Sequence, residues 1–122
     1  MDRRTTRQLG EYGERLACRY LTEIGFTILE RNWRCARGEI DIVAVDGACL
    51  VFCEVKTRSS EVFGAPFEAV TRTKVRRLRR LAGLWLEQAP ACRRQPDLRI
   101  DVISIVRSEG RPSRLEHLRG AA

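Results

Sequence analysis

Residues 38–56 read GEIDIVAVDGACLVFCEVK, in which two runs of β-branched and aromatic residues flank an Asp-Gly pair. An Asp-Gly pair between two such runs is the strongest short-range signal for a β-hairpin. If Asp46 and Gly47 form the two-residue turn, counting back along the strands sets Asp41 opposite Phe52. The stretch therefore predicts two antiparallel strands joined by a tight turn.

The predicted register gathers charged side chains on one face of this hairpin, because side chains alternate between the faces of a strand. That face carries Glu39 opposite Glu54, together with Asp41 and Lys56. The other face is apolar and carries Ile40, Ile42, Ala44, Cys49, Val51, Cys53 and Val55.

The charged face is predicted to bind a divalent cation. Like charges placed opposite each other destabilise a strand pair, and Leu50 and Phe52 on the same face would withdraw the carboxylates from water. A hard divalent cation removes this conflict, because it takes clustered carboxylate oxygens as ligands. The alternative is an ordinary solvated face, which we consider weaker because Leu50 and Phe52 share it.

Length and composition indicate a single globular domain. The chain has 122 residues, with 43% hydrophobic and 32% charged residues, and is expected to form one globular domain over 1–122. Residues 107–122 form a polar tail with at most one short strand, around 115–118. No apolar run approaches the ~20 residues that span a bilayer, and no signal-peptide core is visible. We therefore expect a cytoplasmic protein with no membrane partner.

Apolar spacing predicts two helices, over about 6–24 and 71–88. Strands are expected over 26–32, in the hairpin, and over the β-rich run 98–106. The order α-β-β-β-α-β is that of a small α/β domain with a mixed sheet. Asp101, unusual in an interior strand, either pairs with an Arg or lies near a functional edge. The five cysteines are read as buried or incidental thiols, and His117 as structural or exposed.

The formal net charge of +7 favours an anionic partner, with nucleic acid ahead of a membrane surface. The second helix concentrates positive charge opposite its apolar stripe, and clustered like charges cost stability unless an anion is near. A solvated basic face is the alternative. The predicted nucleic-acid-binding residues are Arg58, Arg72, Lys74, Arg76, Arg79 and Arg80.

An Asp in one strand followed by Glu-x-Lys in the next is the signature of metal-dependent phosphodiesterases of the restriction-endonuclease-like type. Here these residues are Asp41, Glu54 and Lys56. Two carboxylates can hold Mg²⁺ or Mn²⁺, which activates water and stabilises charge on the phosphoryl oxygens. The Lys ammonium can orient or deprotonate that water.

The wider sequence resembles the YraN-like family of small bacterial proteins, from about Gly10 to Ile105. These proteins are assigned a restriction-endonuclease-like fold, related in shape to archaeal Holliday-junction resolvases, and are regarded as nucleases or left uncharacterised. The segments that carry the resemblance are Gly10–Glu14, Ala17, Tyr20-Leu21, Asn32–Arg34, Gly38–Val43, Phe52–Arg58, Phe63–Pro66, Ala69-Val70, Lys74 and Ile100–Ile103.

The resemblance implies a site. Asp41, Glu54 and Val55 are implied as the metal-binding set and Lys56 as the catalytic lysine. Glu14 resembles the helix carboxylate that joins such sites, although a boundary carboxylate paired within its own helix is an equally good interpretation. Glu39 is implied as an accessory catalytic group. Ile40 stands where a proline often precedes the Asp in related nucleases.

Two functions remain open at this stage. The first is a Mg²⁺-dependent endonuclease acting on DNA, with linear, flapped and branched substrates all open and a homodimer favoured if both strands are cut. The second is a non-catalytic module that binds nucleic acid or a protein partner and retains the nuclease fold.

Overall fold

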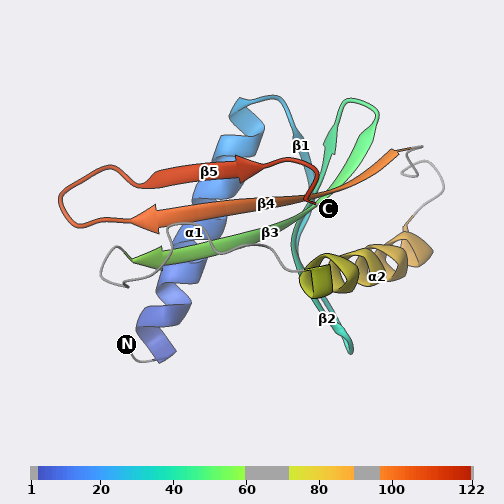
Figure 1. Cartoon of the computed structure of the whole chain (residues 1–122), viewed down its shortest axis with the longest axis horizontal. Helices are drawn as coiled ribbons and strands as arrows, with labels where there is room; N and C mark the ends of the chain where they lie inside the picture. Colours follow the sequence, from blue (N-terminus) through green and yellow to red (C-terminus); the bar gives the residue numbers. More distant parts are fainter. Residues whose placement is uncertain (1–2, 60–71, 90–96, 122) are drawn as a thin grey trace.

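The computed structural model describes residues 3–59, 72–89 and 97–121, with side chains from residue 7 onward. The elements are α1 (Arg3–Glu23), β1 (Thr27–Cys35), β2 (Gly38–Asp46), β3 (Cys49–Ser59), α2 (Arg72–Gln88), β4 (Asp97–Arg107) and β5 (Arg114–Leu118). The expected α/β fold is confirmed, with the short final strand present (Figure 1).

The five strands form one mixed sheet in the order β1-β2-β3-β4-β5. The first three strands are antiparallel neighbours, β3 and β4 run parallel, and β5 returns antiparallel to β4. A parallel pair needs a long crossover connection, and α2 lies within the segment that joins β3 to β4. Strand β4 lies between β3 and β5, so it is an interior strand, as its continuous run of β-formers predicts.

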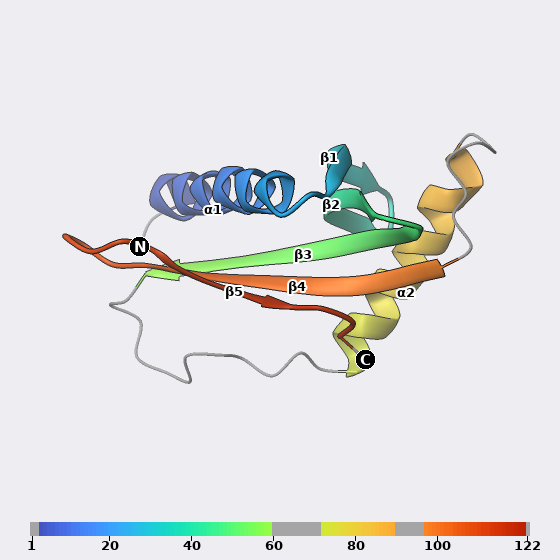
Figure 2. The same ribbon diagram turned by 90° about the horizontal axis from the view of Figure 1, so that it is seen from above.

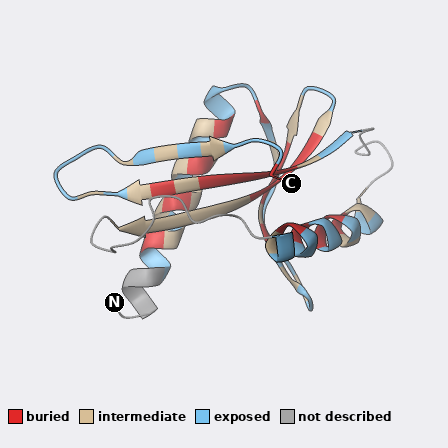
Figure 3. Ribbon diagram, viewed as in Figure 1, coloured by how far each residue is buried: buried red, intermediate tan, exposed pale blue. Residues whose placement is uncertain are grey.

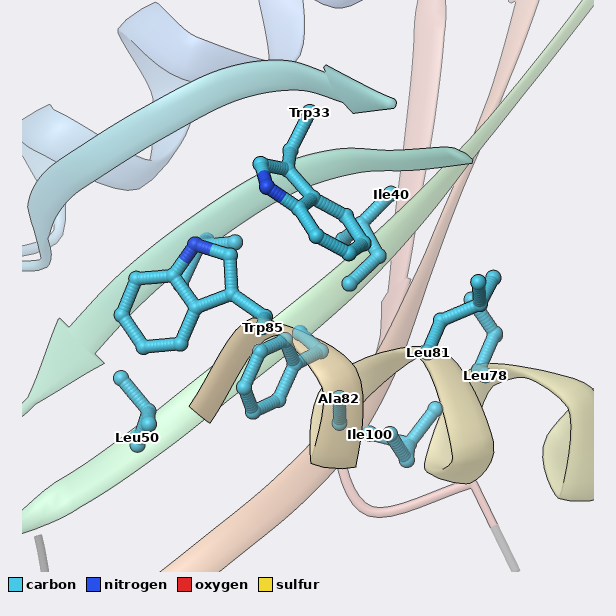
Figure 4. Packing of buried hydrophobic residues seen from close by; sticks show 10 residues of the cluster. Trp33, Ile40, Leu50, Leu78, Leu81, Ala82, Trp85 and Ile100 are labelled. Atoms are coloured by element: carbon cyan, nitrogen blue, oxygen red, sulfur yellow. The ribbon is translucent and has the colours of Figure 1, made fainter. Parts of the chain in front are cut away.

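The two helices lie on opposite faces of the sheet (Figure 2). Each covers a separate apolar cluster, and the buried residues follow the inner face of each helix and the central strands (Figure 3). The α1 cluster contains Ala17, Leu21, Phe26, Ile42, Ala44, Val51, Cys53, Ile103 and Ile105. The α2 cluster contains Trp33, Ile40, Val43, Leu50, Phe52, Leu78, Leu81, Ala82, Trp85 and Ile100 (Figure 4).

Helix α1 approaches the sheet closely at Gly13 and ends at a glycine. A Cβ on Gly13 would lie 1.7 Å from Thr57 Oγ1, so only a residue without a side chain fits there. After the helix, Gly25 has φ of 99°, and the Phe26 N–H donates to the Leu21 carbonyl. This left-handed glycine with a bond back across the last turn is the Schellman helix ending.

The predicted hairpin is confirmed, but its predicted turn is wrong by one residue. The observed pairs are Asp46 with Cys49 and Val43 with Phe52, so Gly47 and Ala48 form the turn. Gly47 has φ of 60°, and a glycine with positive φ at the first turn position is typical of a type II′ hairpin. Phe52 thus pairs with Val43 rather than with Asp41.

Asp101 pairs with an arginine, which was one of the two expectations for it. Its side chain is fully buried, and it accepts two hydrogen bonds from Arg99, at 2.8 and 3.0 Å, and one from the Gly120 N–H. His117 contacts it at 2.8 Å through Nε2 and contacts the Tyr20 hydroxyl through Nδ1. Burial alone would raise the pKa of Asp101, but these hydrogen bonds outweigh it and lower the pKa. The network ties the end of the chain to β4, as expected of a structural histidine.

Candidate active site

The charged residues of the hairpin meet where β2 separates from β3. Pairing between these strands ends at Ile42 and Cys53, whereas β3 remains paired with β4 as far as Ser59. Ile42 packs in the α1 cluster and Ile40 in the α2 cluster. The prediction that both lie on one face is therefore wrong, because β2 twists between them where it separates from β3 while it stays paired with β1. Asp41 lies at this fork.

Asp41 points across the fork toward β3. Its Oδ2 accepts a hydrogen bond from the Val55 backbone N–H at 2.8 Å. Val55 lies beyond the last β2–β3 pair, so the Asp41 side chain takes the place of a backbone carbonyl of β2 as acceptor. The pKa of Asp41 is raised from 3.8 to about 7. Burial is the largest cause, the negative charges of Glu14, Glu39 and Glu54 add to it, and the hydrogen bond from the Val55 N–H opposes it. The carboxylate is thus held in place but lacks a positive partner strong enough to keep its pKa low.

Glu54 lies directly before Val55 on β3, and one of its oxygens is unsatisfied. Its Oε2 is buried and has no hydrogen-bond partner among the described residues. A buried carboxylate oxygen without a partner is costly, and such an atom in a native protein calls for an explanation. The observed register, extended by one residue, brings Asp41 level with Glu54, so two carboxylates share the fork.

Lys56 follows Glu54 on the same side of β3, because alternate residues share a face. Thr57 lies on the opposite face of β3, where its side chain is next to Gly13 of α1. Glu54, Lys56 and Arg58 therefore project away from α1, on a part of the sheet beyond the α2 cluster. The alternation predicted from the sequence places Glu54 and Lys56 together.

Glu14 and Glu39 take different positions around this pair. Glu14 is half-buried on α1, and its charge acts on Asp41 from that side. Glu39 lies at the surface, with its side chain 48% exposed, and its Oε2 forms an ion pair with Arg34 Nε at 3.2 Å. Glu14 is therefore the closer match to a further acidic group at the fork, and Glu39 contributes to its field from the edge.

The donor set fits a magnesium-type ion with many water ligands. In the described part of the chain, no three His, Cys, Asp or Glu side chains converge into a complete metal cage. Mg²⁺ is usually held by one or two carboxylates and keeps several waters. Asp41 and Glu54 provide those carboxylates. Val55 can add only its backbone carbonyl oxygen, since its N–H already donates to Asp41.

The predicted nucleic-acid-binding residues occupy two places. Arg72, Arg76, Arg79 and Arg80 are exposed on α2, where Lys74 is half-buried, and Arg58 is half-buried beside the fork. The apolar stripe of α2 is buried as expected, including Leu81 and Trp85. Two further arginines, Arg37 and Arg77, line a pocket together with Arg80. Only folding reveals this pairing, because a turn and a distant helix form it.

No helix in the described ranges is both long and apolar enough to cross a membrane. The cysteines described, Cys18, Cys35, Cys49 and Cys53, are free thiols. Burial raises the pKa of Cys53 well above its usual range, which suits an inert core thiol.

Comparison with known proteins identifies close relatives along nearly the whole chain. The model of the uncharacterised protein family UPF0102 matches residues 13–105. A UPF0102 protein of Beutenbergia cavernae is 55% identical over 112 residues, covering 92% of this chain and 93% of the relative. A UPF0102 protein of Kineococcus radiotolerans is 52% identical over 114 residues, covering 93% of each chain. A third, from Mycolicibacterium gilvum, is 49% identical and covers 98% of each chain.

Proposed function

This chain belongs to the uncharacterised protein family UPF0102, and we propose that it is a Mg²⁺-dependent endonuclease that hydrolyses phosphodiester bonds in DNA. The observation that carries the proposal is the buried Oε2 of Glu54, which has no hydrogen-bond partner in the described part of the chain and lies at the fork beside Asp41. Membership of this family supports it, because the YraN-like resemblance implies a restriction-endonuclease-like fold, although a fold alone does not decide function.

Asp41 and Glu54 would hold the metal ion, and Mn²⁺ could replace Mg²⁺. When bound, the ion lowers the pKa of a coordinated water and stabilises negative charge on the phosphoryl oxygens. The Val55 N–H orients the Asp41 carboxylate, so this ligand is positioned before any ion binds. The repulsion between the two carboxylates, costly in the free protein, becomes a source of metal affinity.

Lys56 is placed to act on the water and the charge of the reaction. It shares a face of β3 with Glu54, which brings an ammonium group beside the carboxylates. There it can orient the attacking water, accept its proton when neutral, or balance charge that develops on the phosphate when protonated. The formal charge of +7 supports DNA as the anionic substrate, because basic surfaces attract nucleic acid through its phosphates.

The proposal is tested by cleavage of a panel of linear, flapped and four-way DNA with Mg²⁺ or Mn²⁺. We expect Glu54→Gln and Lys56→Ala each to lower the cleavage rate by at least about 100-fold, the range of a positioned acid–base group. Glu87→Gln, on the exposed end of α2, removes one carboxylate far from the fork and serves as the matched control.

Thermal unfolding of each variant separates loss of chemistry from loss of fold. Cleavage that persists in both site variants, or in EDTA, would contradict the proposed centre. DNA binding without cleavage of any substrate would support the non-catalytic binding module instead.

A further inference from the structure

A second site lies between the β1–β2 turn and α2. It is a pocket of about 290 Å³ lined by Arg37, Arg77, Arg80, Leu81 and Leu84. Arg37 comes from the turn between the strands, and the remaining residues come from one flank of α2. We call it the arginine pocket.

The pocket carries uncompensated positive charge. Within the described ranges, none of its three arginines forms a salt bridge, whereas nearby Arg34 is paired with Glu39. Among the residues that the structure describes, no carboxylate lines the pocket. Three guanidinium groups repel one another, and this arrangement is stabilised when an anion binds between them.

The walls of the pocket are fixed to each other by close packing. Gly38 has φ of 143°, and a Cβ built on it would lie 3.3 Å from Arg77 Nη2 and 3.4 Å from Leu81 Cδ1. The guanidinium group of Arg77 thus lies against the bare backbone at the start of β2. Leu81 packs with Trp33 and Ile40 in the α2 cluster, which holds the hairpin end against the helix (Figure 4).

We propose that the arginine pocket binds a backbone phosphate of the DNA strand, outside the metal centre. Guanidinium groups match the geometry of phosphate oxygens. Leu81 and Leu84 supply an apolar wall suited to the sugar carbons beside a phosphate. This proposal rests on the proposed function, because it assigns the pocket a place on the same substrate.

The pocket lies close to the fork along β2. Gly38 precedes Asp41 by three residues, a backbone separation of about 10 Å at a strand rise of about 3.3 Å per residue. A phosphate held in the pocket would therefore belong to the part of the substrate near the fork.

The test is the salt dependence of DNA binding, measured in EDTA so that no cleavage occurs. A fluorescein-labelled DNA duplex is titrated by anisotropy between about 50 and 200 mM KCl with wild type, Arg37→Gln, Arg77→Gln and the matched control Arg111→Gln. Arg111 lies exposed in the turn between β4 and β5 and loses the same charge.

Loss of a phosphate contact reduces the slope of log affinity against log salt by about 1. We expect this reduction in Arg37→Gln and in Arg77→Gln, and a slope within error of wild type in Arg111→Gln. A slope in both pocket variants equal to that of Arg111→Gln would overturn the proposal.

A second measurement tests the pocket without DNA. Inorganic phosphate is titrated into the wild-type protein while the side-chain Nε–H signals of arginine are followed by NMR. Saturable shifts of the Arg37 and Arg77 signals, absent from Arg111, support the pocket, and uniform shifts of all three count against it. If Mg²⁺-dependent cleavage is absent from the wild type while these signals still shift, the proposed function fails and the phosphate pocket stands.

Discussion

Replacing Asp41 by Asn is expected to make the metal-free protein more stable at alkaline pH. Burial and neighbouring negative charges raise the pKa of Asp41 from 3.8 to about 7, so the fold prefers the neutral carboxyl. Asn keeps an oxygen that can accept the Val55 N–H and never carries the charge.

The magnitude follows from linkage between protonation and folding. A carboxyl with a raised folded-state pKa contributes stability that is present below its unfolded pKa and is lost as the pH rises through its folded pKa. For a rise from 3.8 to about 7, the loss is about 4.3 kcal/mol by pH 8, of which roughly 1.7 kcal/mol is already lost at pH 5. The advantage of Asp41→Asn over wild type should therefore grow by about 2.6 kcal/mol between pH 5 and pH 8.

The assay is urea unfolding of both proteins in EDTA at pH 5 and pH 8. Taking the difference between wild type and variant cancels the contribution of titrating groups that do not interact with Asp41. Asp97→Asn, at the exposed start of β4, is the control and should show no such growth. Equal stabilities of wild type and Asp41→Asn at both pH values would refute the description of Asp41 as a destabilised carboxylate.

Magnesium should reverse the effect. An ion at about 100 times its dissociation constant stabilises a folded protein by about 2.7 kcal/mol. This gain is expected in wild type at pH 8 and should be largely lost in Asp41→Asn, which lacks one ligand charge. An equal gain in both proteins would place the bound ion away from Asp41.

Further predictions concern packing and the buried ion pair. Gly13→Ala should destabilise the fold by about 1–3 kcal/mol, because the new Cβ would lie 1.7 Å from Thr57 Oγ1; part of this loss should return in the double variant with Thr57→Ala, as measured in a double-mutant cycle by urea unfolding. Arg99→Ala should cost about 3–5 kcal/mol at pH 7, because it leaves the buried Asp101 charge without its main partner. Because the pKa of Asp101 is lowered in the folded protein, the stability that the ionised Asp101 contributes is present above pH 4 and lost on acidification. The destabilisation by Arg99→Ala should therefore be smaller at pH 3 than at pH 7. An equal destabilisation at both pH values would contradict the pairing of Arg99 with an ionised Asp101.

The grouping of side chains on the hairpin depends little on which residues form its turn. Moving the turn from Asp46-Gly47 to Gly47-Ala48 shifts each cross-strand partner by two residues. Side chains alternate with a period of two, so a shift of two preserves which residues share a face. The observed register, extended by one residue, therefore sets Asp41 level with Glu54, although Phe52 was the wrong partner for Asp41.

The sequence by itself determined the helices, the hairpin, the interior strand and the residue types of the candidate site, because each depends on periodic patterns or short spacings within one element. Only the tertiary structure decided that β2 separates from β3 beyond Ile42, where Ile40 turns toward α2 and Asp41 and Glu54 are left at a fork. It also decided that Arg37 meets α2. These features arise where separate elements pack on each other, and the free energy of that packing depends on contacts between residues far apart in the chain.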